Sequence, residues 1–142
     1  MYINMACYSL GSTVSTWYKA NTTCNSLGTG VHLATISSAT ENNAIKAYYG
    51  TSISMWIGLN CIATHASSGT AGEVWVWADG STSAYRDWSS GEPSNQFGTE
   101  ACVHLYASAN GAWNDLTCTI SYIGPPYIYG LCKFTPGMDV GG

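Results

Sequence analysis

The stretch Met55-Trp56-Ile57-Gly58-Leu59 opens a region of strands and loops in this chain of 142 residues. It is a short apolar run, and it predicts a β-strand. A second strand is predicted at Val74-Trp75-Val76-Trp77, which is rich in aromatic residues and is followed by the turn signal Ala78-Asp79-Gly80. Residues 60–72 between the two runs are small and polar, and they predict a loop. From residue 53 onward the chain is therefore expected to consist of strands and loops.

Two helices are predicted before residue 51. Residues 14–27 place apolar side chains near one helical face, and Gly28 is a natural stop. The second helix has a sharper signal, because Ser38-Ala39-Thr40-Glu41 is a capping box that satisfies free amide groups at a helix start. Gly50 closes that helix.

Two more strands are predicted at Cys102–Tyr106 and Gly130–Phe134. Residues 79–100 hold turn-forming residues with little periodicity and predict a long loop. Pro125-Pro126 excludes a helix between residues 119 and 128. Two helices followed by short strands and a long polar loop indicate a single α+β domain that spans residues 1–142.

The composition is unusual in its charge. Charged residues make up 8% of the chain, against about 25% in an ordinary soluble domain. Four basic and eight acidic residues give a formal net charge of −4, so the chain has no means of neutralising the phosphates of a nucleic acid or of holding an anionic membrane. No apolar run approaches the ~20 residues that a membrane span needs. The hydrophobic content of 46%, with six Trp and ten Tyr, predicts a packed fold.

An even number of widely spaced cysteines is typical of disulfides in a secreted protein. The six are Cys7, Cys24, Cys61, Cys102, Cys118 and Cys132. Reduced cysteines in a cytosolic protein are the alternative, whereas the lack of a CxxC motif argues against zinc. No basic region followed by an apolar stretch comes after Met1, so we expect the mature part of a secreted protein. The spacing alone selects none of the fifteen pairings that six cysteines allow.

Acidic residues are concentrated in one part of the chain. Six of the eight lie between residues 73 and 115: Glu73, Asp79, Asp87, Glu92, Glu100 and Asp115. Carboxylates mixed with Asn and Ser oxygens in polar loops suit Ca²⁺, which takes six to eight oxygen ligands. The candidate ligands form two groups, at residues 92–100 and 114–115, which flank the predicted strand Cys102–Tyr106. The alternative is that these loop acids only solvate the surface.

Taken together, the motifs resemble those of the C-type lectin-like domain over nearly the full length of the chain. They stand in the family's order: Trp17, Ala20 and Cys24 in a first helix, Leu33–Ile36, Glu41 in a second helix, Met55–Leu59, Trp75–Gly80, Tyr85, Trp88, Gly91–Asn95, Cys102-Val103, Trp113-Asn114-Asp115, Cys118 and Cys132. Each motif is weak alone, and their joint order is what carries the resemblance. It implies a fold of two helices flanking small antiparallel sheets, with a long calcium-binding loop region and disulfide staples.

The resemblance implies two disulfides, Cys24–Cys132 and Cys102–Cys118. Cys7 and Cys61 then remain. Pairing them with each other is the simplest way to leave no free thiol, and an intermolecular bridge through either one is the rival.

The resemblance also implies a Ca²⁺ site. Its ligands would be Glu92, Ser94, Glu100, Asn114 and Asp115, and Pro93 is expected to follow a cis peptide bond. Ser94 is a departure, because the family has Asn or Asp there. Its hydroxyl would bind the metal directly or leave that task to the neighbouring Asn95 or to a water. A second calcium is not expected, since Ala101 stands where an acidic ligand would be needed.

The function implied is calcium-dependent binding of glycans through vicinal hydroxyls of a hexose, either galactose-type or mannose-type. Glu92 and Glu100 would accept hydrogen bonds from the sugar, and Asn114 would donate one. Phe97 is the candidate for stacking on the sugar, whereas Trp88 is expected to pack in the core. His104 is expected either at the sugar's edge or in a structural role. The predicted sugar-binding residues are Glu92, Ser94, Asn95, Phe97, Glu100, His104 and Asn114.

Two other functions compete with that of a lectin. A glycosidase pair is not expected, because calcium would hold Glu92 and Glu100 ionised and a general acid needs a raised pKa. The serious alternative is a domain of this fold that binds a protein, ice or a mineral surface without using sugar. A single lectin site binds weakly and gains avidity when sites are linked, which favours a homodimer.

Overall fold

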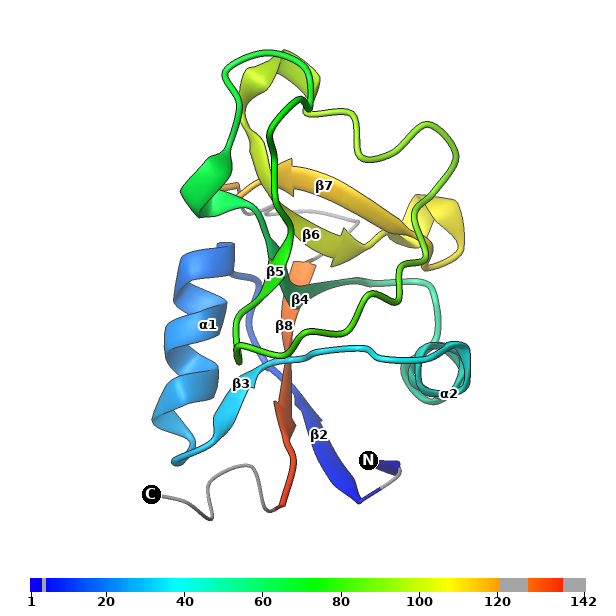
Figure 1. Cartoon of the computed structure of the whole chain (residues 1–142). Coiled ribbons are helices and arrows are strands. Elements are labelled where there is room, and N and C mark those ends of the chain that lie inside the picture. The colour runs from blue at the N-terminus through cyan, green and yellow to red at the C-terminus, as the bar shows by residue number, and fades with distance from the viewer. Residues whose placement is uncertain (4, 121–127, 137–142) are drawn as a thin grey trace.

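The computed structural model describes residues 1–3, 5–120 and 128–136, and in them two helices flank a sheet of eight strands (Figure 1). The elements are β1 (Tyr2–Ile3), β2 (Ala6–Leu10), α1 (Trp17–Ser26), β3 (Val31–Leu33), α2 (Ala39–Tyr49), β4 (Ser54–Asn60), β5 (Val76–Trp77), β6 (Glu100–Leu105), β7 (Trp113–Thr117) and β8 (Ile128–Phe134). Much of the long loop region between β4 and β6 lies above the helices in the view of Figure 1, whereas β5 descends to the level of α1. The predicted α+β architecture is confirmed.

The sheet follows the order β1-β2-β8-β4-β6-β7, with β3 added to β8 and β5 added to β4. Among the described strands, every pairing is antiparallel except that of β4 with β8. The expected antiparallel pairing is thus found at every junction but this one. A parallel neighbour needs a long connection, and the chain between β4 and β8 supplies one by building the whole loop region.

Strand β4 is the centre of the fold, and all seven of its residues are buried. Met55, Ile57 and Leu59 face one hydrophobic cluster, and Trp56 faces another. The first cluster includes Ile45 of α2 and the second includes residues of α1, so each helix covers one face of the strand. Alternation of side chains along a strand explains this division.

Gly58 is needed in β4 because other backbone segments press against it. A Cβ at this position would lie 2.7 Å from the carbonyl oxygen of Leu33. The Gly58 amide donates to the Ala34 carbonyl at 2.8 Å, and its carbonyl accepts from the Ala78 amide at 3.0 Å. The glycine therefore lets three parts of the chain meet at one point.

Both helices form close to their predicted positions. Helix α1 begins at Trp17 rather than at residue 14, because the Thr16 side chain caps it by accepting from the Lys19 amide. Helix α2 begins after Ser38, whose hydroxyl accepts from the Glu41 amide at 3.1 Å, as the capping box predicts. Neither α-helix in the described part has the length and apolar character of a membrane span.

The strand predictions were less complete. The predicted strand at residues 74–77 is shorter, since only Val76 and Trp77 pair with β4. The sequence did not predict β1, β2, β3 and β7, because these strands are short and their residues do not stand out from the neighbouring loops. Pro125 and Pro126 lie outside the described residues.

The disulfides Cys24–Cys132 and Cys102–Cys118 are confirmed. The expected Cys7–Cys61 pair is wrong, because both thiols are free. Cys7 is exposed on β2, and Cys61 is buried directly after β4. In Figure 1, β2 lies at the opposite end of the molecule from the segment that follows β4, which keeps the two thiols apart.

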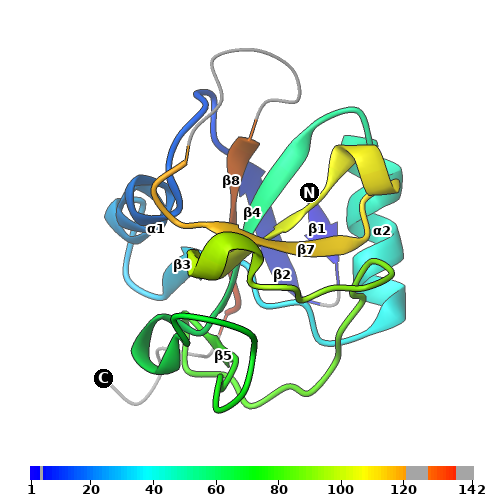
Figure 2. The same ribbon diagram turned by 90° about the horizontal axis from the view of Figure 1, so that it is seen from above.

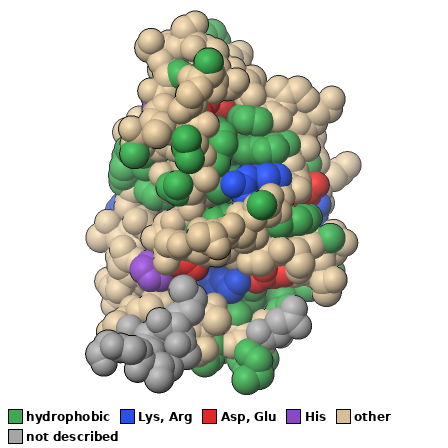
Figure 3. Space-filling model, viewed as in Figure 1, with side chains coloured by type: hydrophobic (Ala, Val, Ile, Leu, Met, Phe, Trp, Pro, Cys, Tyr) green, Lys and Arg blue, Asp and Glu red, His purple; other side chains and the backbone are tan. Residues whose placement is uncertain are grey.

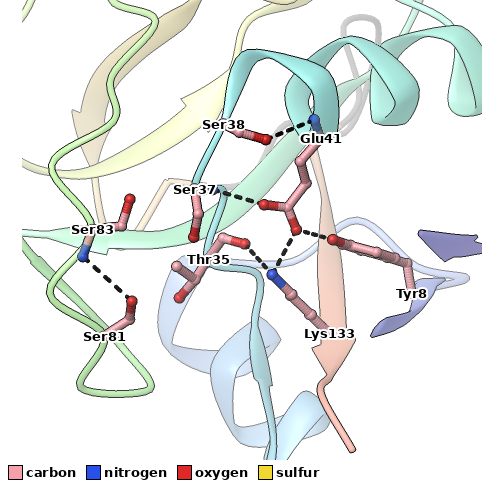
Figure 4. A network of polar contacts seen from close by, with 8 residues as sticks. All are labelled: Tyr8, Thr35, Ser37, Ser38, Glu41, Ser81, Ser83 and Lys133. Carbon is pink, nitrogen blue, oxygen red and sulfur yellow. Dashed lines mark hydrogen bonds and ion pairs between the residues drawn. The ribbon is translucent and has the colours of Figure 1, made fainter. Parts of the chain in front are cut away.

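A buried carboxylate fastens helix α2 to the sheet (Figure 4). Glu41 accepts from the Tyr8 hydroxyl on β2, from the Ser37 amide at 2.7 Å and from Lys133 Nζ on β8 at 2.6 Å. Lys133 also donates to the Thr35 carbonyl at 2.8 Å. One side chain thus joins α2, β2 and β8, and the charge of Lys133 is compensated where little water reaches it.

We expect Glu41→Gln to lower the free energy of unfolding by about 3 kcal/mol, because it leaves the buried ammonium of Lys133 without a counter-charge. Urea titration at neutral pH measures this change. Lys46→Gln is the matched control, because it breaks the more exposed Lys46–Asp87 pair and should cost less than about 1 kcal/mol. Equal losses in the two variants would contradict the role given to Glu41.

Candidate functional site

The sheet brings together the two groups of predicted ligands. Strand β7 pairs with β6 so that Asp115 lies opposite Val103 and Asn114 lies opposite His104. The loop that carries residues 92–98 leads directly into β6, and its short helical turn lies in front of β7 in the view from above (Figure 2). The peptide bond between Glu92 and Pro93 is cis, as predicted.

Asp115 fastens this loop to β7. Its side chain is fully buried, and its two carboxylate oxygens accept from the Ser94 amide at 3.1 Å and the Asn95 amide at 2.7 Å. Burial raises the pKa of Asp115, although the two amide bonds act in the opposite direction. The carboxylate therefore sets the positions of Ser94 and Asn95.

Glu92 and Ser94 in the loop lie close to Glu100, the first residue of β6. The Ser94 hydroxyl donates to Glu92 Oε1 at 2.9 Å, and the Gln96 amide donates to Glu100 Oε1 at 2.8 Å. Burial first, and then the charges of Asp115 and Glu92, raise the pKa of Glu100 to about 7, although the hydrogen bond from the Gln96 amide acts in the opposite direction. Burial and the charge of Asp115 also raise the pKa of Glu92. The three carboxylates thus repel one another.

No basic side chain compensates this cluster in the described part of the chain. The two ion pairs found there are Lys46–Asp87 and Lys133–Glu41, both outside the loop. Carboxylates, a hydroxyl and an amide are donors that suit Ca²⁺, so the residues fit a hard cation in chemistry and charge. Within the same described residues, no three His, Cys, Asp or Glu side chains are arranged so that they could hold a metal by themselves. A cation would therefore need Ser94, Asn114, backbone oxygens or water as further ligands.

The other clustered acids have separate roles. Asp79 accepts from the Ser81 amide at 2.8 Å within its own turn. Asp87 accepts from Asn42 at 2.8 Å and from Lys46 at 2.9 Å, which ties the long loop to α2. Glu73 accepts from the Ala66 amide at 3.2 Å, and its charge raises the pKa of Asp115. The expectation that acids gather around a cation thus applies to Glu92, Glu100 and Asp115.

Asn95 has a structural role in place of the expected sugar contact. It is 3% exposed, and its Nδ2 donates to the carbonyls of Ala66 and Gly69 at 2.8 and 2.7 Å. Its Oδ1 accepts from the Glu100 amide at 3.0 Å and lies 3.0 Å from His65 Nε2. Every hydrogen-bonding position of the amide is used, so none is left for a sugar or a metal. Asn95 instead joins the loop at residues 65–69 to the loop at residues 94–100.

His104 is buried rather than placed at the edge of a sugar. Its ring is 2% exposed and lies between those of Trp56 and Tyr106, with centroids 5.8 and 5.0 Å away. Burial lowers the pKa of His104 to about 3, which keeps the ring neutral. Its Nε2 lies 3.1 Å from Asn114 Nδ2. Of the two roles expected for His104, the structure supports the structural one.

The two aromatic candidates lie in different surroundings. Phe97 is 89% exposed at the tip of the loop, where φ is 62°. Trp88 packs against Trp75 and Trp113, with ring centroids 5.2 and 6.3 Å away, so the expected core role is confirmed. Gly98, next to Phe97, has a φ of 71°, and a Cβ there would lie 2.1 Å from the Ser67 carbonyl oxygen. The loop tip is thus packed tightly while Phe97 projects from it.

Sequence reasoning did not identify His65 or Cys61 as part of this region. His65 reaches Asn95 from a loop thirty residues earlier in the chain. Cys61 is buried directly after β4, where burial and then the charge of Glu73 raise the pKa of its thiol to about 12. No local motif marks either residue, because their partners come from distant segments.

The sequence and the structure are similar to those of C-type lectins. The family model described as "Lectin C-type domain" matches residues 13–123. A mannose-binding isoform of C-type lectin from Notechis scutatus scutatus is 32% identical over 136 residues, which are 92% of this chain and 79% of that protein. An alpha-N-acetylgalactosamine-specific lectin from Patiria pectinifera is 32% identical over 131 residues, covering 85% of this chain and 73% of that protein. A calcium-independent type II antifreeze protein has a similar structure, with a TM-score of 0.75, 26% identity and coverage of 95% and 90%.

We expect Glu100→Gln to alter the pH dependence of unfolding of the metal-free protein. Folding raises the pKa of Glu100 from about 4.3 to about 7, so the folded state binds this proton more tightly. The resulting stabilisation is fully present below about pH 4.3 and is lost as the pH rises through 7. The variant has no such proton to lose.

Melting temperatures of both proteins in EDTA, from pH 4 to 8, measure this effect. The wild type should lose stability relative to the variant as the pH rises. Titration of His104 acts on both proteins alike and cancels in the difference. A difference that stays constant with pH would show that Glu100 has an ordinary pKa.

Proposed function

Because the chain belongs to the C-type lectin family, we propose that it binds glycans with Ca²⁺ as its cofactor, at a site formed by Glu92, Ser94, Glu100, Asn114 and Asp115. The observation that carries this proposal is the group of three carboxylates at one loop with no basic partner in the described part of the chain. A bound cation would relieve their mutual repulsion, and their oxygens are the ligands that Ca²⁺ prefers.

Each residue of the site would make a different contact with a hexose. Ca²⁺, when bound, supplies coordination positions for two adjacent hydroxyl groups of the sugar. Glu92 and Glu100 accept hydrogen bonds from these hydroxyls, and Asn114 donates one. The Ser94 hydroxyl can do either, since it is both a donor and an acceptor. Phe97 offers an exposed apolar face beside them.

We propose a hexose with vicinal hydroxyls, of galactose or mannose type. One relative is named for mannose and another for N-acetylgalactosamine, so the family includes both kinds of binder. Ser94 stands where the motifs for either sugar have Asn or Asp. A projecting aromatic ring favours galactose, whose apolar face can stack on it, and Phe97 is the candidate for that contact.

The alternative is a domain of this fold with a partner other than sugar. Its support is the similarity to a calcium-independent antifreeze protein. The surface is also poor in charge, and Figure 3 shows a face on which uncharged polar side chains and backbone predominate. Such a surface would suit ice, a mineral or a protein.

We propose no catalytic activity for the chain. In the metal-free protein the pKa values of Glu92 and Glu100 are raised, as a general acid requires. Ca²⁺ would keep both carboxylates ionised and so remove that acid. The matched family is one of lectin domains.

We propose that the protein is secreted. The two disulfides support this, since disulfides persist in oxidising compartments.

The protein should be retained on immobilised galactose or mannose in the presence of Ca²⁺ and should elute with EDTA. The resin that retains it identifies the class of sugar. Phe97→Ala should weaken binding to galactose more than to mannose, because stacking on the ring is lost. Retention on neither resin with Ca²⁺ present would refute the lectin proposal and favour the alternative partner.

We also propose that two copies join through Cys7 to form a homodimer, which would link two weak sites and raise avidity. Oxidised glutathione is the expected oxidant: it takes two electrons, the two thiols lose their protons, and one Sγ–Sγ bond forms. Non-reducing electrophoresis should show a dimer that dithiothreitol dissolves. Cys7→Ser should stay monomeric, whereas Cys61→Ser should still dimerise because Cys61 is buried. A wild type that stays monomeric with the oxidant would contradict the dimer.

A further inference from the structure

Trp56, His104 and Asn114 form a row across three neighbouring strands. Trp56 on β4 lies opposite His104 on β6, and His104 lies opposite Asn114 on β7. The rings of Trp56 and His104 are 5.8 Å apart, and His104 Nε2 lies 3.1 Å from Asn114 Nδ2. The row thus runs from the buried core to a residue of the proposed carbohydrate site.

The chemistry of the two groups sets the direction of the hydrogen bond between them. Asn114 Nδ2 carries two hydrogens and can only donate. His104 Nε2 must therefore accept, and the proton of the neutral ring stands on Nδ1. That nitrogen is buried and has no hydrogen-bond partner in the described part of the chain. Leaving it unpaired costs free energy that an apolar side chain at this position would avoid.

We propose that His104 is a positioning residue that determines which end of the Asn114 carboxamide faces the carbohydrate site. This inference rests on the proposed function. One hydrogen of Asn114 Nδ2 is held by His104, so the oxygen at the other end of the amide is left for the cation and the second hydrogen for a sugar hydroxyl. A ring with its proton on Nε2 would attract the amide oxygen instead and turn the group over.

The arrangement gives the polar ring of His104 a role in this part of the core. Groups behind a metal ligand commonly fix its orientation, and replacing them lowers metal affinity by about 10- to 100-fold. His104 can do this for Asn114 because its own ring is held by Trp56 and Tyr106. The tautomer of His104 on β6 therefore specifies the orientation of Asn114 on β7.

Nitrogen NMR of the metal-free wild type tests the orientation directly. We expect His104 to be protonated on Nδ1 and unprotonated on Nε2, with one of the two Asn114 side-chain protons coupled to Nε2 across the hydrogen bond. A proton on Nε2 would overturn the proposal. This measurement needs neither calcium nor sugar, so its outcome does not depend on whether the proposed function is correct.

A double-mutant cycle tests the consequence for binding. His104→Phe keeps a planar ring but removes the acceptor, and it should lower Ca²⁺ affinity about 10-fold or more, whereas His104→Gln retains an acceptor and should stay close to wild type. In an Asn114→Ala background, His104→Phe should cause no further loss. Equal affinities of His104→Phe and wild type, or the same loss in both backgrounds, would overturn the proposal. A wild type that binds no Ca²⁺ would instead refute the proposed cofactor.

Discussion

The burial of both faces of β4 is the constraint on which the rest of the structure depends. Its odd-numbered side chains enter the cluster covered by α2, and Trp56 enters the cluster covered by α1. Polar contacts also fasten the α1 segment to β4, since Trp17 Nε1 donates to the Ile57 carbonyl and Trp56 Nε1 donates to the Ser15 carbonyl, both at 2.8 Å. Because β4 is covered on both faces, the chain that leaves it at Asn60 can form a long loop region without exposing the core.

The candidate site inherits its geometry from that strand. Strand β6 pairs with β4 and β7 pairs with β6, so Asn114 and Asp115 are held in register with the core. The Cys102–Cys118 disulfide joins β6 to the residue that directly follows β7. Asp115 then holds the backbone of residues 94–95, and Asn95 holds the loop at residues 65–69. Most of these contacts are hydrogen bonds to backbone, which position the loop before any ligand arrives.

Much of this could be predicted from local signals. The capping box at Ser38, the apolar run at Met55–Leu59 and the order of the motifs led to the fold and to both disulfides. Strand β7 was missed, because its sequence Trp113-Asn114-Asp115 resembles a polar turn until it is paired with β6. The pairing of Cys7 with Cys61 was wrong, since it rested on counting cysteines and not on distance. Asn95 and His104 were placed near the sugar because their residue types suit one, although burial assigns them to the interior.

The sequence by itself determined the elements, the family resemblance and the candidate ligands, because caps, hydrophobic runs and motif order depend on residues close together in the chain. Only the tertiary structure decided which acids lie close together, which side-chain amide keeps unused hydrogen-bonding positions and which histidine is buried. Burial and the direction of a hydrogen bond depend on partners that are distant in sequence, such as His65 with Asn95 or His104 with Asn114. The same carboxyl group has an ordinary pKa in a solvated loop and a raised one where it is buried beside two others, and only the fold creates those surroundings.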